Sequence, residues 1–173
     1  MERNLVNDFR RLLELVSGEC IPCRDIDALR RELQGILTRE KCRTAACSHH
    51  ALVKQAIAGI SLESAEPSEA NVGITGADAL IAETGTVAVV TDVGCPRTLL
   101  FLPPLHIVVA ETIQIVPDLA STLEIIAKRT TPWSSFTLIT GPSRTADIEK
   151  ILIRGVHGPK KLCVLLLESP PSP

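Results

Sequence analysis

The segment GITGADALIAETGT, residues 73–86, indicates the fold of this chain more directly than any other stretch. It holds two short apolar runs, separated by a glycine and an aspartate and followed by the turn ETGT. Short apolar runs between such residues are typical of strands, and runs without polar alternation suit strands that are buried on both faces. The segment therefore predicts strands joined by tight turns within a covered sheet.

Further strand and helix candidates lie on both sides of this segment. The strand candidates are short and rich in β-branched residues, and they cover 43–47, 72–75, 79–82, 86–91, 106–110, 136–140 and 162–167. Apolar residues recur at helical spacing in 5–16, 25–37, 48–57 and 117–127. This alternation predicts an α/β fold, with a mixed, mostly parallel sheet covered by helices and an N-terminal helical extension over 1–40. We expect one domain, residues 1–173.

Composition and charge exclude several classes of protein. Apolar residues make up 45% of the 173 residues, but aromatic residues only 2%, so few rings are present to stack on nucleic-acid bases. The net charge is −2 and no basic stripe occurs, so we expect no nucleic-acid partner. The longest apolar run, 99–110, is shorter than the roughly 18–20 residues of a membrane span. The first residues contain charges rather than an apolar signal region, so we expect a cytoplasmic protein.

The chain has six cysteines, which we expect to be reduced in the cytoplasm. Cys20 and Cys23 form a C-x-x-C pair, and Cys42 and Cys47 follow, with two histidines close behind. Such a set can surround zinc. The spacing of the second pair is looser than in the usual zinc knuckle, however, so we expect no metal site.

The turn Glu83–Thr86 is the first candidate site. It places a carboxylate, two hydroxyls and a glycine between two apolar strands, so several backbone N–H groups can face a phosphate or a carboxylate. Upstream, Gly76 permits close backbone approach, and Asp78 lies near a chain reversal. A tight hairpin whose polar residues bond to one another explains the same residues. Both interpretations stay open.

The segment GPSRTADIE, residues 141–149, is the second candidate site. Gly141 follows a strand, and Ser143 or Thr145 can cap a short helix that runs to Glu149. The N-terminus of such a helix attracts anions, and Arg144 adds a positive charge. A capped helix with Arg144 in solvent is the alternative.

Two histidines are further candidates. His106 lies among apolar residues at the start of a strand, where it is either a buried core imidazole or a proton-transfer group that projects into the site. His157 lies in a glycine–proline turn, where a binding role fits.

Four motifs resemble a known family. GITGADALIAETGT is followed by LPPLHIVV (102–109), TLITGPSRTADIE (137–149) and GVHGPKKL (155–162). In this order, over about residues 70–168, they resemble the LUD-domain family, and specifically its LutC/YkgG branch. The resemblance implies a fold similar to that of ribose-phosphate isomerases and CoA transferases. It also implies a part in oxidising L-lactate to pyruvate beside iron–sulfur partner proteins.

The resemblance also suggests roles for the candidate residues. CoA transferases use a glutamate beside a glycine as nucleophile, and Glu83 has a similar sequence context. The expected catalytic residues are Glu83 and His106. The expected residues for binding a small carboxylate or phosphate are Gly76, Asp78, Thr84, Gly85, Thr86, Gly141, Ser143, Arg144 and His157.

The chain also departs from the family. Its segment before Gly73 is short and poorly matched, and it lacks the multi-cysteine segment of the iron–sulfur relatives, so we do not expect it to carry a cluster. We expect no cofactor, because no glycine-rich dinucleotide fingerprint occurs, although a bound flavin and homo-oligomerisation stay open. Two alternatives to the lactate role remain: an independent enzyme acting on a sugar phosphate or acyl-CoA, and a non-catalytic assembly subunit.

Overall fold

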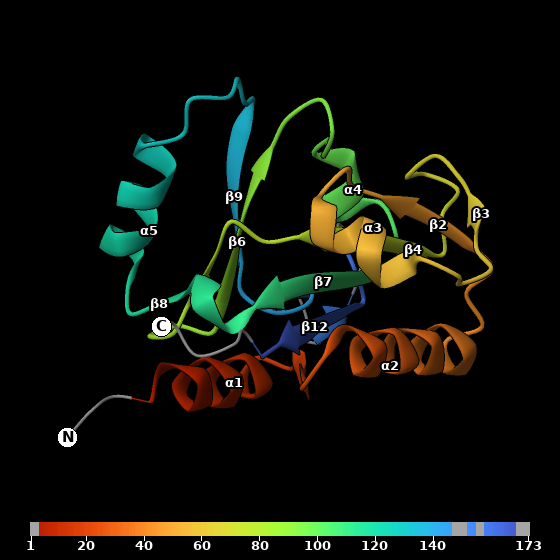
Figure 1. Cartoon of the computed structure of the whole chain (residues 1–173), viewed down its shortest axis with the longest axis horizontal. Helices are drawn as coiled ribbons and strands as arrows, with labels where there is room; N and C mark the ends of the chain where they lie inside the picture. Colours follow the sequence, from red (N-terminus) through yellow and green to blue (C-terminus); the bar gives the residue numbers. More distant parts are fainter. Residues whose placement is uncertain (1–3, 147–151, 155–157, 169–173) are drawn as a thin grey trace.

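The computed structural model describes residues 4–146, 152–154 and 158–168, and it confirms the predicted α/β fold class. Its helices are α1 (Leu5–Leu15), α2 (Ile26–Arg39), α3 (Ala51–Ile57), α4 (Thr98–Phe101) and α5 (Leu119–Ala127), with a short 3-10 helix at Thr112–Gln114. Its strands are β1 (Glu19–Cys23), β2 (Thr44–Cys47), β3 (Glu63–Ser64), β4 (Val72–Gly76), β5 (Ala79–Ile81), β6 (Thr86–Thr91), β7 (Leu105–Glu111), β8 (Ile115–Val116), β9 (Ser135–Ile139), β10 (Arg144–Ala146), β11 (Leu152–Arg154) and β12 (Lys161–Leu167). Figure 1 shows their arrangement.

A six-stranded parallel sheet forms the centre of the molecule, in the order β1-β12-β7-β4-β2-β3 (Figure 1). Its middle strands are apolar on both faces, because both faces are covered. Ile107 and Val109 of β7 pack with side chains of α2 and α3. Val108 and Ala110 of the same strand pack with α1 and with β5 and β6. Alternate residues of one strand thus supply two separate cores.

A second, four-stranded sheet has the order β8-β5-β6-β9. In it, β5 and β6 form an antiparallel hairpin, β9 pairs antiparallel with β6, and β8 pairs parallel with β5. The β5–β6 hairpin is the one that GITGADALIAETGT predicts, and its turn is the ETGT segment. The expected mixed strand arrangement is therefore divided between two sheets, one of which is wholly parallel.

Strand β1 was not expected from the sequence, because ECIPC is short and contains Pro22. Proline lacks an N–H donor and is confined mainly to edge strands and strand ends. The structure places β1 at the edge of the parallel sheet, beside β12. This edge position accommodates the proline.

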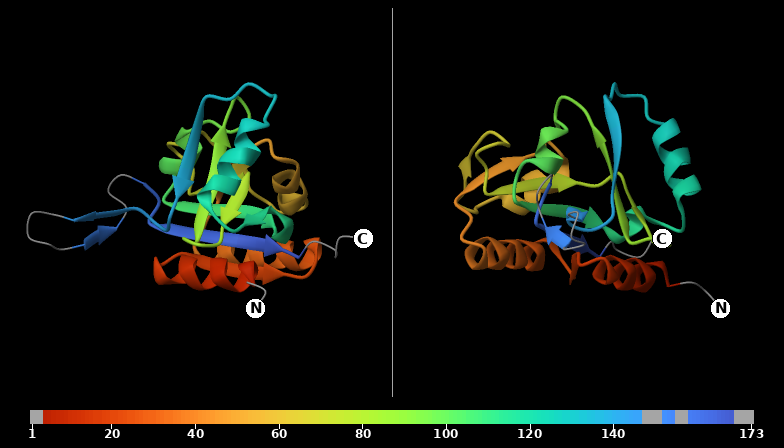
Figure 2. Two further views of the ribbon diagram at one scale, coloured as in Figure 1. Left: turned by 90° about the vertical axis from the view of Figure 1, so that its left-hand side faces the viewer. Right: turned by 180° about the vertical axis from the view of Figure 1, so that it is seen from behind.

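The expected helix after Ser143 is wrong for the residues that the structure describes there. Arg144–Ala146 forms β10, which pairs antiparallel with β11. Figure 2 shows this two-stranded hairpin projecting away from the two larger sheets. The local capping pattern predicted a helix, but the run Leu152–Arg154 supplies a strand partner that short-range reasoning overlooked. Asp147 and Glu149 lie outside the described residues.

Candidate functional site

The topology of the parallel sheet indicates where a ligand site is expected. From β2 the chain continues outward to β3, whereas from β4 it continues in the opposite direction to β7. Strands β2 and β4 are neighbours, so the chain reverses its direction across the sheet between them. In open α/β sheets, ligands bind outside the carboxyl ends of strands at such a switch point. A ligand site is therefore expected at the carboxyl ends of β2 and β4.

A cleft of about 530 Å³ lies at this position. Ser48, His49 and His50, which connect β2 to α3, form one part of its lining. Gly76 and Asp78, at the end of β4 and just beyond it, form another. The loop after β6 and the segment after α5 complete the lining.

Ser48 is the buried polar residue of the cleft. Ser48 is only 4% exposed, and its backbone N–H donates a hydrogen bond to the carbonyl of Ile74 at 2.9 Å. Its hydroxyl, however, has no hydrogen-bond partner among the described residues. A buried hydroxyl without a partner is destabilising by roughly 1–3 kcal/mol. A ligand that reaches this hydroxyl would supply the missing partner.

The two histidines are seated by glycines on neighbouring segments. A Cβ atom on Gly76 would lie 2.4 Å from Cγ of His50, and one on Gly94 would lie 3.0 Å from Cβ of His49. The Nδ1 atom of His50 accepts a hydrogen bond from the N–H of Leu52 at 3.3 Å, which caps α3. Both imidazoles are exposed. Glycine at position 76 therefore leaves room for the ring of His50 against the end of β4.

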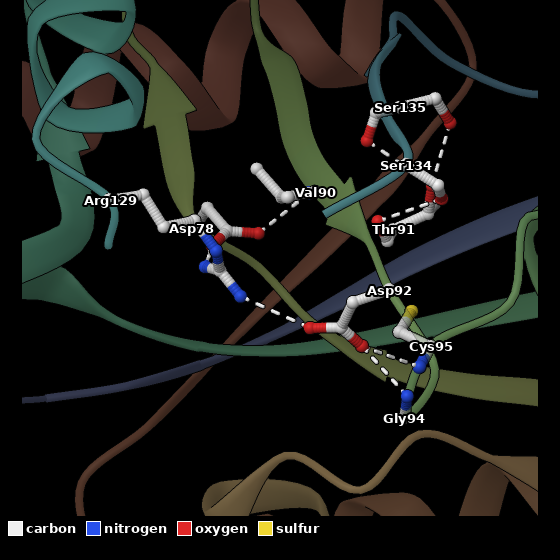
Figure 3. A network of polar contacts seen from close by, with 9 residues as sticks. All are labelled: Asp78, Val90, Thr91, Asp92, Gly94, Cys95, Arg129, Ser134 and Ser135. Atoms are coloured by element: carbon white, nitrogen blue, oxygen red, sulfur yellow. Dashed lines mark hydrogen bonds and ion pairs between the residues drawn. The ribbon is translucent and has the colours of Figure 1, made fainter. Parts of the chain in front are cut away.

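Arg129 links two carboxylates in the cleft lining (Figure 3). Its Nη1 lies 2.5 Å from Oδ1 of Asp78, and its Nη2 lies 3.2 Å from Oδ2 of Asp92. Asp78 also accepts the N–H of Val90 at 2.7 Å. The Nε atom of Arg129 is buried and has no partner among the described residues. This group carries two negative charges and one positive charge, so it holds an excess of one carboxylate.

Asp92 also organises the loop that contains Cys95. Its Oδ1 accepts the N–H of Gly94 at 2.8 Å and that of Cys95 at 3.0 Å (Figure 3). Burial, followed by the charges of Asp92 and Asp78, raises the pKa of the Cys95 thiol to about 11. Since the thiolate is the nucleophilic form, this thiol is poorly suited to nucleophilic attack at neutral pH.

The ETGT turn and the turn at Gly141 lie side by side, but they lie against α1 and not in the cleft. The pairing of β6 with β9 places Thr86 beside Thr140, whose hydroxyls are 2.7 Å apart. Thr84 donates to the hydroxyl of Thr86 at 2.8 Å. Gly85 and Gly141 have positive φ, of 64° and 82°. A Cβ on Gly85 would lie 2.2 Å from the N atom of Leu13, and one on Gly141 would lie 2.6 Å from the carbonyl oxygen of Val16.

Glu83 lies on the exposed side of the first turn. Its Oε1 accepts the N–H of Leu119 at 3.1 Å, at the beginning of α5. It does not line the described cleft. A contact that caps a helix accounts for this carboxylate, and its catalytic role stays a prediction.

His106 is fully buried in β7. Its Nε2 lies 2.9 Å from the hydroxyl of Thr75, and burial lowers its pKa from 6.5 to about 4. Its Nδ1 has no partner in the described part of the chain. This environment is that of a neutral core imidazole, the first of the two readings of the sequence, and proton transfer by His106 stays a prediction.

Ser143, Arg144 and His157 are the remaining predicted site residues. The N–H of Ser143 donates to the carbonyl of Pro159 at 2.9 Å. The side chain of Arg144 and all of His157 lie outside the described part of the structure. Of the eleven predicted site residues, the cleft contains Gly76 and Asp78.

The cleft also contains residues that the sequence did not single out as site residues. The pair His49–His50 directly after a strand was a usable signal, because a strand end followed by polar residues is a frequent ligand position. Arg129 gave no comparable signal, since it is 51 positions from Asp78. Over residues 4–146, 152–154 and 158–168, no three His, Cys, Asp or Glu side chains gather in a way that could hold a metal ion.

The family follows from comparison with known proteins. The model of the LUD domain matches residues 64–167, which is more than half of the chain, so the chain belongs to the LUD domain family. It is 38% identical over 107 residues to the lactate utilization protein C of Anoxybacillus flavithermus, covering 62% of this chain and 47% of that protein. It is 39% identical over 103 residues to the lactate utilization protein C of Bacillus subtilis, covering 57% of this chain and 43% of that protein. The match thus spans less than half the length of these relatives.

A solved structure shows the same fold. The crystal structure of a DUF162 family protein from Deinococcus radiodurans superposes with a TM-score of 0.72 at 20% identity, over 96% of this chain and 99% of that chain. No helix among the described residues is long and apolar enough to cross a membrane.

Proposed function

We propose that this chain takes part in lactate utilization in the cytoplasm, and that its cleft binds a small 2-hydroxy acid, L-lactate, or the keto acid formed from it. The relatives named lactate utilization protein C support the pathway. The observation that carries the binding site is a pair of buried, unpartnered polar atoms that belong to two residues lining one cleft. These are the hydroxyl of Ser48 and the Nε atom of Arg129.

The chemistry of these two atoms suits a 2-hydroxy acid. The hydroxyl of Ser48 can both donate and accept, and the Nε–H of Arg129 can only donate. A 2-hydroxy acid offers a hydroxyl and a carboxylate on neighbouring carbon atoms, which supplies a partner for each. The excess carboxylate of the Asp78–Arg129–Asp92 group disfavours a phosphate dianion more than a monoanion. This charge balance favours lactate over a sugar phosphate.

The two histidines differ in the proton chemistry that they support. Nδ1 of His50 accepts a backbone N–H, so in the neutral ring the proton is on Nε2, which can donate to a ligand carboxylate. The side chain of His49 is exposed and lines the cleft, so it is the better candidate for taking the hydroxyl proton. Oxidation of lactate to pyruvate releases two electrons and two protons. His49 takes the hydroxyl proton, and we assign the Cα proton and both electrons to the iron–sulfur partner proteins that the resemblance implies.

Complementation tests this proposal. A strain that lacks the gene is grown on L-lactate as sole carbon source and is supplied with wild-type, Ser48→Ala, His49→Gln or Glu83→Gln protein at matched abundance. We expect the wild type and Glu83→Gln to restore growth, and Ser48→Ala and His49→Gln to fail.

Each other outcome has a definite meaning. Failure of Glu83→Gln together with rescue by Ser48→Ala would move the site to the ETGT turn. Rescue by every variant would favour an assembly role. Normal growth of the deletion strain would reject the lactate role. Calorimetry with purified protein separates binding from pathway membership: a true ligand at 100 times its dissociation constant stabilises the fold by about 2.7 kcal/mol.

A further inference from the structure

Large apolar side chains are exposed mainly along one segment of the chain. Of the nine such side chains in the described residues, five lie between positions 119 and 138, and each is 38–49% exposed: Leu119, Leu123, Ile125, Trp133 and Leu138. Trp133 is the only tryptophan of the protein. Tryptophan is enriched at the energetic centres of protein interfaces, and a concentration of exposed apolar side chains marks an interaction surface.

Helix α5 is the centre of this surface. Its buried residues are Thr122 and Ile126. At 100° per residue, its apolar stripe continues past them through Leu119 and Leu123 to two exposed alanines, Ala120 and Ala127. A stripe about 160° wide is thus only half covered by the rest of the described chain. Figures 1 and 2 show α5 at the outer end of the molecule, the end where β9 also lies.

The polar border of the exposed stripe contains one acidic and one basic residue. Glu124 and Lys128 follow the alanines around the helix, and both are exposed. When two antiparallel helices are related by a twofold axis, the same border of each helix meets the other. If the twofold axis crosses the helix at the level of residue 125, Leu123 of one copy lies against Ala127 of the other. A large side chain then packs against a small one. The same axis also brings Glu124 of one copy towards Lys128 of the other.

We propose that this surface, defined as the exposed stripe of α5 that contains Leu119, Ala120, Leu123 and Ala127, binds a second copy of the same chain in an antiparallel, twofold arrangement. Its charges favour self-association, because the acid and the base of one copy complement those of another. Twofold dimers are also the commonest soluble oligomers. A lipid surface suits the helix less well, since membrane-surface helices carry a strongly basic polar face.

Sedimentation equilibrium of the purified full chain without ligand tests the dimer. We expect the wild type to be dimeric and Leu123→Glu to weaken the dimer at least 100-fold, because it places an unpaired charge at the centre of the interface. Leu15→Glu is the matched control, since Leu15 is 68% exposed on α1, away from this surface. It should leave the dimer intact. A monomeric wild type, or equal effects of both substitutions, would overturn the proposal.

Charge reversal tests the antiparallel arrangement itself. Glu124→Lys places two lysines on each border, and Lys128→Glu places two glutamates there, so each variant alone should dimerise more weakly than the wild type. Mixed in equal amounts, the two variants should form a heterodimer, because every pair across the interface is then of opposite charge. If either substitution weakened the dimer by destabilising α5, mixing the two variants would not restore dimerisation. Dimers that persist in both variants, or weakened variants without recovery on mixing, would contradict the antiparallel arrangement.

Discussion

The molecule has two junctions rich in glycine and polar residues, and they differ in what the glycines face. At the ETGT turn and Gly141, an added Cβ would meet the backbone of α1, and the hydroxyls of Thr84, Thr86 and Thr140 bond to one another. At the cleft, an added Cβ on Gly76 would meet the imidazole of His50, and the hydroxyl of Ser48 has no partner among the described residues. The first junction is covered and its hydroxyls are satisfied, whereas the second is open and has unpaired groups.

Glycines that serve packing can therefore be distinguished from glycines that make room for a functional side chain. Because glycine has no Cβ, other atoms can approach its backbone closely. Only the structure shows whether a helix or a functional side chain occupies that space. Polar atoms without partners are the second criterion, because a stable fold leaves few of them. Both criteria favour the cleft as the place where a ligand is bound.

The largest expected effect concerns the covered junction. Gly85→Ala should lower the free energy of unfolding by about 4 kcal/mol, because it adds a Cβ close to the backbone of Leu13 at a left-handed φ. Gly35→Ala in α2 is the matched control. Nothing lies within 4 Å of its added Cβ, and it should stabilise the helix by up to about 1 kcal/mol. Urea unfolding measures both, and equal stability of the two variants would show that α1 does not close this junction.

The next effect concerns acid stability and contrasts the buried imidazole of His106 with the exposed ones of the cleft. Because the pKa of His106 is about 4 in the folded chain and near 6.5 when unfolded, the unfolded chain takes up a proton first as the pH falls. The contribution of neutral His106 to the free energy of unfolding should therefore be fully present above pH 6.5. It should fall by roughly 3 kcal/mol as the pH is lowered to 4. The difference in unfolding free energy between pH 7 and pH 5 should be smaller in His106→Gln. An unchanged difference would show that His106 does not cause it.

The smallest effect compares one hydroxyl from each junction. Thr86→Val removes hydrogen bonds to Thr84 and Thr140 and should destabilise the fold by about 1–2 kcal/mol without changing ligand affinity. Ser48→Ala removes a buried hydroxyl without a described partner, so it should stabilise the fold by about 1–3 kcal/mol while affinity falls. Chemical unfolding and calorimetry of the two variants provide the comparison. A strongly destabilised Ser48→Ala would mean that this hydroxyl serves the fold.

The sequence predicted the elements whose signals are local. Strands β4, β5, β6 and β7 were correctly predicted, because their apolar β-branched runs carry enough information by themselves. Strand β1 was missed, because its pairing with β12 involves residues about 140 positions away. The helix after Ser143 was predicted wrongly, because the capping pattern is local and does not reveal the pairing of β10 with β11.

The candidate site was predicted only in part, for a similar reason. Gly76 and Asp78 belong to a motif that stands out in the sequence, and both line the cleft. The ion pair of Arg129 with Asp78 joins residues 51 positions apart and exists only after the second sheet has formed. Local patterns contain no information on such a contact.

The position of β12 between β1 and β7 affects how the protein can be made. On the ribosome, β1 is synthesised about 140 residues before Lys161–Leu167, the strand that it pairs with. Until β12 is available, β1 and one edge of β7 both lack the strand with which they pair. Contacts between distant parts of a chain slow folding and prolong the exposure of unpaired strand edges. Ribosome-bound chains that end before Lys161 should therefore be open to proteolysis at β1, and longer chains in which Lys161–Leu167 has left the ribosome should be protected there.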